Sequence, residues 1–236
     1  MNENALHDRH VVITGGTGAL GSAVVKRFLD AGATCHVTWV AQRELERFPH
    51  ADAVQLHQLD AADEPAVARF YESLPALWAS VHLIGGFAMS PIEQTSAQDF
   101  RKMIDMNALT CFLCCREAVR RMRAADASAS SAGGRIVNVA ARPAVHAMGG
   151  MIAYSEAKAA VAAITQSLAE VVKADRILVN AILPSIMDTP ANRAAMPNAD
   201  FGKWPKVEEV AETIAFLACP TNGLTSGALV PVFGTA

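Results

Sequence analysis

The stretch that decides the fold is Thr14–Gly21, TGGTGALG, which directly follows the apolar run HVVIT. Gly16, Gly18 and Gly21 satisfy G-x-G-x-x-G between a predicted strand and a predicted helix, the context in which this motif binds a dinucleotide. Glycines let the backbone turn tightly, and the helix N-terminus stabilises the charge of a pyrophosphate. No Lys-Ser/Thr pair follows, so the turn is not a P-loop. The alternative interpretation is an ordinary glycine turn.

Beyond this turn, apolar runs alternate with segments of helical periodicity. The predicted strands are His10–Thr14, Thr34–Val40, Ala53–Leu59, Val81–Gly85, Arg135–Ala140, Ile177–Leu183 and Ala228–Phe233. The predicted helices are Ala19–Ala31, Glu64–Ser73, Ala97–Arg123, Met151–Lys173 and Val207–Ala218. This alternation predicts an α/β fold: a single-domain Rossmann-type doubly wound parallel sheet of about seven strands over residues 1–236. Residues 1–8 are expected to be a polar tail, and the biased segment Ala124–Gly134 (AADASASSAGG) a solvent loop.

Composition excludes several classes of function. The 236 residues are 52% hydrophobic, which supports a sizeable core, and the net charge of −3 offers no basic footprint for nucleic acid. No apolar run reaches the roughly 18–20 residues that a membrane span needs. Five cysteines without framework spacing fit a reducing compartment. We expect a cytoplasmic protein with a small-molecule substrate and no metal, nucleic-acid or membrane partner.

The end of the second predicted strand bears on the choice of cofactor. An acid there, about 20 residues after the glycine motif, usually binds the ribose of NAD. Here the strand ends Trp39-Val40 without an acid, and Arg43 follows, ahead of Glu44 and Glu46. The missing carboxylate and the nearby Arg43 favour NADP(H) over NAD(H). Alternatively, Arg43 is a solvated surface charge.

A tyrosine and a lysine share one face of a long predicted helix. In YSEAK, Tyr154 and Lys158 are four residues apart and therefore one turn apart. A phenol has an ordinary pKa of about 10, and a nearby ammonium favours the phenolate. The pair is thus a candidate general acid/base device. The alternative is a partly exposed Tyr beside a solvated Lys.

Five landmarks in order resemble the short-chain dehydrogenases/reductases. They are TGGTGALG, Asn107 in the long middle helix, GRIVNVA (Gly134–Ala140), YSEAK, and VNAILPSIMDTP (Val179–Pro190). The resemblance covers nearly the whole chain and implies a nicotinamide cofactor and hydride transfer. It implies that Tyr154 is the acid/base, that Lys158 holds the nicotinamide ribose and tunes the phenol, and that Asn107 kinks its helix and holds a water of a proton relay.

The same resemblance implies where the cofactor and substrate lie. Asp60 should meet the adenine amine, while the Ile186 backbone and the Thr189 side chain should meet the nicotinamide carboxamide. Residues 190–206 would form a substrate lid, and the chain would be a homodimer or homotetramer. The full set of expected cofactor-binding residues is Gly15, Thr17, Gly18, Leu20, Gly21, Arg43, Asp60, Gly85, Gly86, Tyr154, Lys158, Pro184, Ile186 and Thr189.

Three departures from the family pattern stand out. The family's catalytic serine lies 13 residues before the tyrosine, and here that position is Ala141. Losing one oxyanion-type donor costs about 10²–10³ in rate. The Asn-Asn-Ala-Gly after the fourth strand is replaced by LIGG, residues 83–86, and Ser185 replaces a glycine after Pro184. The Ser185 hydroxyl is either a substitute donor or a structural turn group.

These departures resemble one branch, the dihydropteridine reductases, which also lack the serine. The shared segments are Gly85-Gly86, GMIAY ending at Tyr154, and DTPANRAAMP (Asp188–Pro197). A quinonoid ring accepts hydride without a serine aimed at an isolated carbonyl, so this branch implies a conjugated-ring substrate. Against it, Trp39 stands where those reductases carry an acid for NADH. The alternative function is a cofactor-binding protein with little catalysis.

Three cysteines, Cys111, Cys114 and Cys115, form a C-x-x-C-C cluster in the middle helix. A metal or redox site needs further ligands such as His, and none is adjacent in the sequence. We interpret the cluster as buried helix packing.

Overall fold

The computed structural model describes residues 4–126 and 133–235 and contains a parallel seven-stranded sheet, as predicted. The strand order is β3-β2-β1-β4-β5-β6-β7, so the order reverses between β1 and β4. The strands are β1 (His10–Thr14), β2 (Thr34–Trp39), β3 (Gln55–Gln58), β4 (Leu77–His82), β5 (Gly134–Val139), β6 (Ile177–Pro184) and β7 (Leu229–Val232). In open α/β sheets the crevice for ligands opens at such a reversal, outside the carboxyl ends of the strands.

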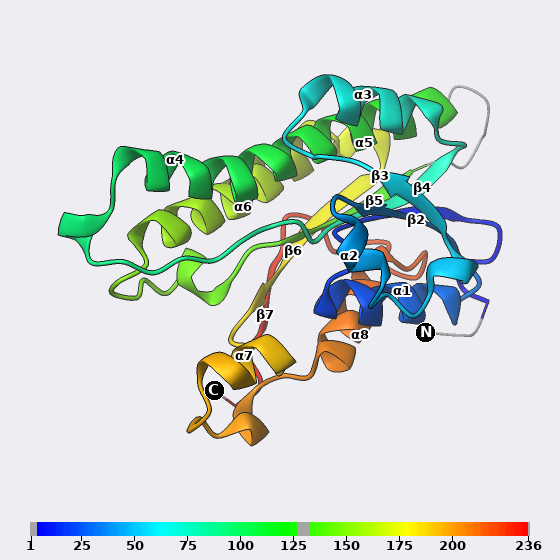
Figure 1. Cartoon of the computed structure of the whole chain (residues 1–236). Coiled ribbons are helices and arrows are strands. Elements are labelled where there is room, and N and C mark those ends of the chain that lie inside the picture. Colours follow the sequence, from blue (N-terminus) through cyan, green and yellow to red (C-terminus); the bar gives the residue numbers. More distant parts are fainter. Residues whose placement is uncertain (1–3, 127–132, 236) are drawn as a thin grey trace.

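Helices cover both faces of the sheet (Figure 1). One layer holds α3, α5 and α6, with α4 lying alongside α6, and the other holds α1 and α8. The helices are α1 (Ala19–Leu29), α2 (Gln42–Leu45), α3 (Glu64–Ser73), α4 (Ala97–Ile104), α5 (Thr110–Asp126), α6 (Ile152–Val171), α7 (Pro190–Ala195) and α8 (Val207–Ala218). This arrangement is the doubly wound fold that alternating strands and helices predict.

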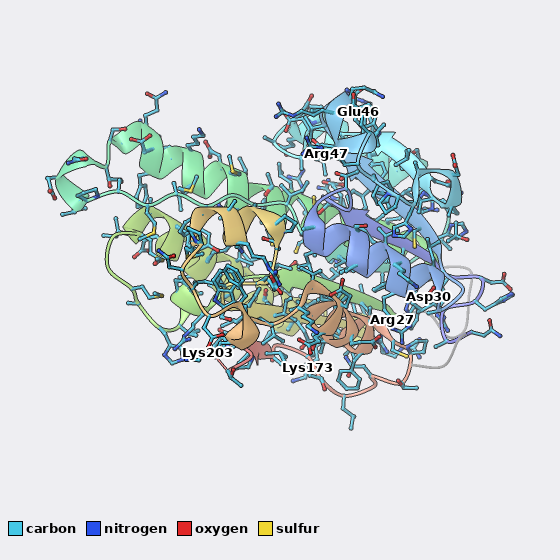
Figure 2. All side chains as sticks on the ribbon, turned by 60° about the horizontal axis from the view of Figure 1, so that its bottom comes forward. Arg27, Asp30, Glu46, Arg47, Lys173 and Lys203 are labelled. Atoms are coloured by element: carbon cyan, nitrogen blue, oxygen red, sulfur yellow. The ribbon has the colours of Figure 1, made fainter. Side chains whose placement is uncertain are left out.

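Charged side chains lie mainly on the outside of these layers. Figure 2 shows Asp30, Glu46 and Lys203 at the periphery of the molecule. Across the outer surface, Arg27 of α1 forms an ion pair with Glu212 of α8. Inside, each face of the sheet packs on its own hydrophobic cluster.

The structure corrects the predicted bounds of one strand and one helix. The fourth strand covers Leu77–His82 rather than Val81–Gly85, because residues 83–86 continue past the end of the parallel ladder with β5. The predicted helix Ala97–Arg123 is two α-helices joined by a π-helical turn, Asp105–Leu109.

The N-terminal segment also departs from the prediction of a polar tail over residues 1–8. Leu6 is fully buried beside α1, and its N–H donates to the carbonyl of Ala31. The segment is therefore part of the packed domain from Leu6 onward. Of the segment predicted as a solvent loop, α5 extends to Asp126, and residues 127–132 lie outside the described part.

Candidate active site

A cavity of about 860 Å³ opens at the carboxyl ends of β1 to β4. Its walls come from the segments that follow those strands: Gly15, Thr17 and Gly18; Thr38, Trp39 and Val40; Asp60, Ala61 and Ala62; and Leu83, Ile84 and Gly85. The far wall is α4 and the π-helical turn, including Lys102 and Met106. The cavity therefore lies at the point where the strand order reverses, as the fold requires of a ligand site.

The glycine turn closes tightly because two of its glycines have no room for a side chain. Gly15 has φ +66°, and its N–H donates to the Thr38 hydroxyl at 3.2 Å. A Cβ on Gly21 would lie 2.4 Å from the carbonyl oxygen of Gly15, so α1 approaches the turn at a distance only glycine permits. The turn points the N-terminus of the 11-residue α1 toward the cavity. Cavity volume, turn and helix terminus fit a dinucleotide with its pyrophosphate at the turn.

The polar groups at the adenosine end of this cavity differ from those the sequence favoured. Arg43 is exposed and does not line the cavity. Glu44 does, and its carboxylate accepts hydrogen bonds from the Thr17 hydroxyl at 2.7 Å and the Ala41 N–H at 3.0 Å. Although burial opposes it, these bonds hold the pKa of Glu44 below its usual range. Asp60 also lines the cavity.

Asn107 lies in the π-helical turn and is 1% exposed. Its Oδ1 accepts from the Gly86 N–H at 3.2 Å, while its Nδ2 donates to the carbonyls of Gly86 at 3.2 Å and Met103 at 3.0 Å. A π-turn of this kind frequently marks a functional site. The helix departs from α geometry at Asn107, where the resemblance implied a kink.

Lys158 meets Asn107 at Gly85. A Cβ on Gly85 would lie 2.5 Å from Asn107 Oδ1 and 3.2 Å from Lys158 Nζ, so the two side chains converge on that glycine. The ammonium of Lys158 donates to the Val139 carbonyl at 2.8 Å. Burial lowers the pKa of Lys158 to about 8, with Cys111 acting in the opposite direction. The lysine is therefore a buried, held group and not the solvated surface charge of the alternative interpretation.

Tyr154 lies one turn earlier on α6, and Lys158 Nζ is 6.0 Å from its ring centroid. Phe87 packs edge-on against the Tyr154 ring, with the centroids 5.0 Å apart. Burial raises the pKa of Tyr154 to about 12, which is opposite to the lowering expected from the sequence. Desolvation disfavours the phenolate, so the hydroxyl is protonated at neutral pH.

No hydroxyl occupies the position of the family serine. Ala141 is 4% exposed and directly follows the Ala140 that ends the β5 segment. The Ser185 hydroxyl donates to the Phe233 carbonyl at 2.7 Å, so it joins the segments after β6 and β7 and is the structural turn group of the two alternatives.

Several expected cofactor contacts lie outside the cavity lining. Leu20 is 8% exposed and packs in the hydrophobic cluster beneath α1, so its side chain is not available to a ligand. Ile186 is 40% exposed, and Thr189 caps α7 by accepting from the Asn192 N–H. The other expected residues outside this lining are Gly21, Gly86, Tyr154, Lys158 and Pro184.

The sequence analysis missed a histidine beside the cysteine cluster. His82 at the end of β4 lies with Cys111 and Cys115 so that their ligand atoms are all within 4.8 Å of one another. The three cysteines are buried, as predicted, and the fold brings to them a histidine that is distant in the sequence. The signal was the buried position of a histidine in an otherwise apolar strand run, 29 residues before Cys111 in the chain.

Comparisons with known proteins agree with this geometry. The family model "short chain dehydrogenase" matches residues 9–200. The chain belongs to the short chain dehydrogenase family. It is 30% identical to cis-4-hydroxycyclohexanecarboxylate dehydrogenase of Sinomonas cyclohexanicum, over 98% of this chain and 97% of the relative.

Two solved structures extend the comparison. A short-chain type dehydrogenase/reductase from Mycobacterium ulcerans superimposes with a TM-score of 0.89 at 23% identity, over 98% of this chain and 90% of that one. BdcA in complex with NADPH matches with a TM-score of 0.85 at 26% identity, over 98% and 95% of the two chains. This short chain dehydrogenase is thus an oxidoreductase. Among the described residues, no helix is long and apolar enough to cross a membrane.

Proposed function

We propose that this short chain dehydrogenase transfers hydride between a nicotinamide cofactor and a small carbonyl or conjugated-ring substrate, with Tyr154 as the acid/base. The observation that carries the proposal is the convergence of Asn107 and Lys158 on Gly85, with Tyr154 one turn from Lys158. A protein that only binds the cofactor has no need of a buried ammonium next to a buried phenol.

The cofactor supplies the hydride, and the chain supplies position and the proton. The turn from Gly15 to Gly21 would hold the pyrophosphate, and Lys158 would hold the nicotinamide ribose. The Tyr154 hydroxyl, whose pKa burial raises to about 12, carries a proton at neutral pH. It would deliver that proton to the reduced substrate, and the Lys158 ammonium would favour this transfer by stabilising the phenolate left behind. In the opposite direction this phenolate would accept the proton.

The substrate class follows from what is missing beside the tyrosine. Ala141 offers no hydrogen bond to an isolated carbonyl, whereas a conjugated ring spreads the developing charge over several atoms. Phe87 is 60% exposed and packs edge-on against the Tyr154 ring, so it offers an aromatic surface to a flat substrate. We therefore favour a quinonoid ring, of which a dihydropteridine is one candidate, over a simple ketone.

We also propose that residues 190–206 act as the substrate lid. The segment is held at its start by the ion pair of Asp188 with Arg193, whose N···O distance is 2.6 Å. Near its end, Phe201 and Trp204 pack together with ring centroids 5.0 Å apart, and Trp204 is 8% exposed. Their aromatic faces would cover a planar ligand.

Replacing Tyr154 by Phe tests the proposal. General acid/base catalysis contributes about 10²–10⁴-fold, so Tyr154→Phe should lose turnover by that factor and bind NADH or NADPH as the wild type does. A screen of quinonoid pterins, quinones and ketones, followed by NAD(P)H absorbance, supplies the substrate. Unchanged turnover in Tyr154→Phe would contradict the proposal. An absence of turnover with all three classes, together with intact cofactor binding, would favour the binding protein without catalysis.

The choice between NAD(H) and NADP(H) depends on which charged side chain lines the cavity after β2. Arg43 favoured NADP(H), but the cavity is lined by Glu44 instead. An ionised carboxylate accepts hydrogen bonds from ribose hydroxyls and repels a 2′-phosphate. We therefore propose that Glu44 makes NAD(H) the preferred cofactor.

The variant Glu44→Gln tests this assignment. It should improve NADPH binding relative to NADH by about tenfold, equivalent to about 1.4 kcal/mol. Arg43→Ala is the matched control and should leave the ratio of the two dissociation constants unchanged. If the ratio responds to Arg43→Ala and not to Glu44→Gln, the original preference for NADP(H) is the correct one.

A further inference from the structure

A second group of buried polar side chains lies where β4, β5 and α5 meet. His82 is 4% exposed, Cys111 is 5% exposed and Cys115 is 2% exposed. One ring nitrogen of His82 and the two sulfur atoms lie within 4.8 Å of one another. The proposed hydride transfer uses none of these three residues.

A chain of hydrogen bonds fixes which atoms face this cluster. Asn138 Nδ2 donates to the Thr165 hydroxyl at 2.9 Å, and that hydroxyl donates to the Val161 carbonyl at 2.8 Å. The other end of the Asn138 amide, Oδ1, therefore faces the cluster. It lies 3.4 Å from Cys115 Sγ and 2.8 Å from His82 Nδ1.

The histidine is oriented from its opposite side. Ser80 Oγ lies 2.8 Å from His82 Nε2, and Tyr71 Oη lies 2.8 Å from Ser80 Oγ. Nδ1 consequently points at the cysteines, 3.5 Å from Cys115 Sγ. Histidines that bind metals are usually held in this way, with the second ring nitrogen bonded to an oxygen that fixes the ring.

We propose that His82 Nδ1, Cys111 Sγ and Cys115 Sγ bind a thiophilic divalent cation of the Zn²⁺ class, with Asn138 Oδ1 at the fourth position. Zn–S bonds of about 2.3 Å and Zn–N bonds of about 2.0 Å place tetrahedral ligand atoms about 3.3–3.8 Å apart. The three protein atoms need to move inward by about 1 Å or less to reach that geometry. Two thiolates neutralise the charge of the ion, which the low-dielectric surroundings require.

The protons balance with water as the acceptor. Both cysteines bind the ion as thiolates, so each thiol proton passes to solvent on binding. The His82 ring binds through an unprotonated Nδ1 and carries its proton at Nε2, which then donates to Ser80.

The site is next to the cavity without being part of it. Leu83 and Thr110 line the cavity and are the chain neighbours of His82 and Cys111. Because the ligands differ from Tyr154, Lys158 and Asn107, the metal proposal stands or falls independently of the proposed hydride transfer.

Cadmium is the probe, since Cd²⁺ bound to thiolates gives a charge-transfer absorption in the ultraviolet. The fully reduced protein should take up one equivalent of Cd²⁺ with this band and release the thiol protons of the two cysteines. The double variant Cys111→Ala/Cys115→Ala should lack the band. Cys114→Ala is the matched control, because Cys114 is buried on the same helix outside the ligand group, and it should keep the band.

A further variant tests the orientation of the histidine. Ser80→Ala removes the oxygen partner of His82 Nε2 and should weaken Cd²⁺ binding by about 10–100-fold while the band remains. Far-UV circular dichroism of every variant shows whether the fold is retained. The proposal is overturned if the wild type gives no band with Cd²⁺, a result that needs no variant, or if a folded Cys111→Ala/Cys115→Ala protein keeps it.

Discussion

The two faces of the sheet differ in what they bury. The buried cluster against α1 and α8 is formed by apolar residues, including Ile13, Phe28 and Ile214. The face against α3, α5 and α6 contains aliphatic packing too, but it also buries Ser80, His82 and Asn138. Since alternate residues of a strand point to opposite faces, β4 contributes Ala79 and Val81 to the first face and Ser80 and His82 to the second.

This difference indicates a division between stability and chemistry. The first face gains free energy mainly from the burial of apolar side chains. The polar groups buried on it are few: Arg135 donates to the Asn222 carbonyl and Asn180 to the Thr225 carbonyl. The polar face pairs its buried groups with one another across three elements. Each of these groups therefore needs a hydrogen-bond partner in the correct position. Lys158 and Asn107 approach the site from helices of this second layer. The following predictions compare the two faces, from the largest effect to the smallest.

The apolar face should respond to the loss of volume. Phe28 is fully buried on α1, so Phe28→Ala should reduce the free energy of unfolding by about 3–5 kcal/mol through lost burial and a cavity. Urea denaturation measures it, and the activity per folded molecule should be unchanged. Phe28→Leu is the conservative control and should lose much less. A change in the Michaelis constant of the folded Phe28→Ala protein would break the division between the faces.

The polar face should respond to the loss of one hydrogen-bond partner at constant volume. Thr165 is fully buried and accepts from Asn138 Nδ2. Thr165→Val keeps the shape and leaves that donor unpaired, so the free energy of unfolding should fall by about 1–3 kcal/mol. Thr165→Ser retains the hydroxyl and should lose less than Thr165→Val. Equal losses in the two variants would show that packing, and not the hydrogen bond, holds this face together.

The charge of Lys158 should set an upper pH limit on catalysis. Burial lowers its pKa to about 8, so the ammonium is present below pH 8 and is lost above it, while the phenol of Tyr154 stays protonated because its pKa is about 12. The turnover rate in the direction of reduction should therefore fall about tenfold per pH unit above pH 8. In Lys158→Arg, whose guanidinium keeps its charge in this range, the fall should disappear. A fall at the same pH in both proteins would assign it to another group.

The strands and helices could be predicted from the sequence where apolar residues within one segment form its buried face. The predicted spans of α3 and α8 match the structure because caps and periodicity sit in the same short segment. The fourth strand was placed too late: its predicted span, Val81–Gly85, includes His82 but begins after the polar Ser80, and both side chains are buried in the structure. Their burial depends on Tyr71 and Asn138, which come from other elements.

The candidate site was predictable to the extent that it follows from spacing along one element. The separation of Tyr154 and Lys158 is such a spacing, and the glycine turn is another. That Glu44 and not Arg43 lines the cavity depends on how α2 packs after β2, which is a tertiary feature. The rise in the Tyr154 pKa depends on burial by residues such as Phe87, which the sequence places 67 positions away.

A crystal structure with the nicotinamide cofactor bound tests the central claim most directly. The account predicts the pyrophosphate at the turn from Gly15 to Gly21, the Lys158 ammonium within hydrogen-bond distance of the nicotinamide ribose, and the Tyr154 hydroxyl facing the carbon that exchanges hydride. A nicotinamide ring bound away from Tyr154 and Lys158 would contradict it.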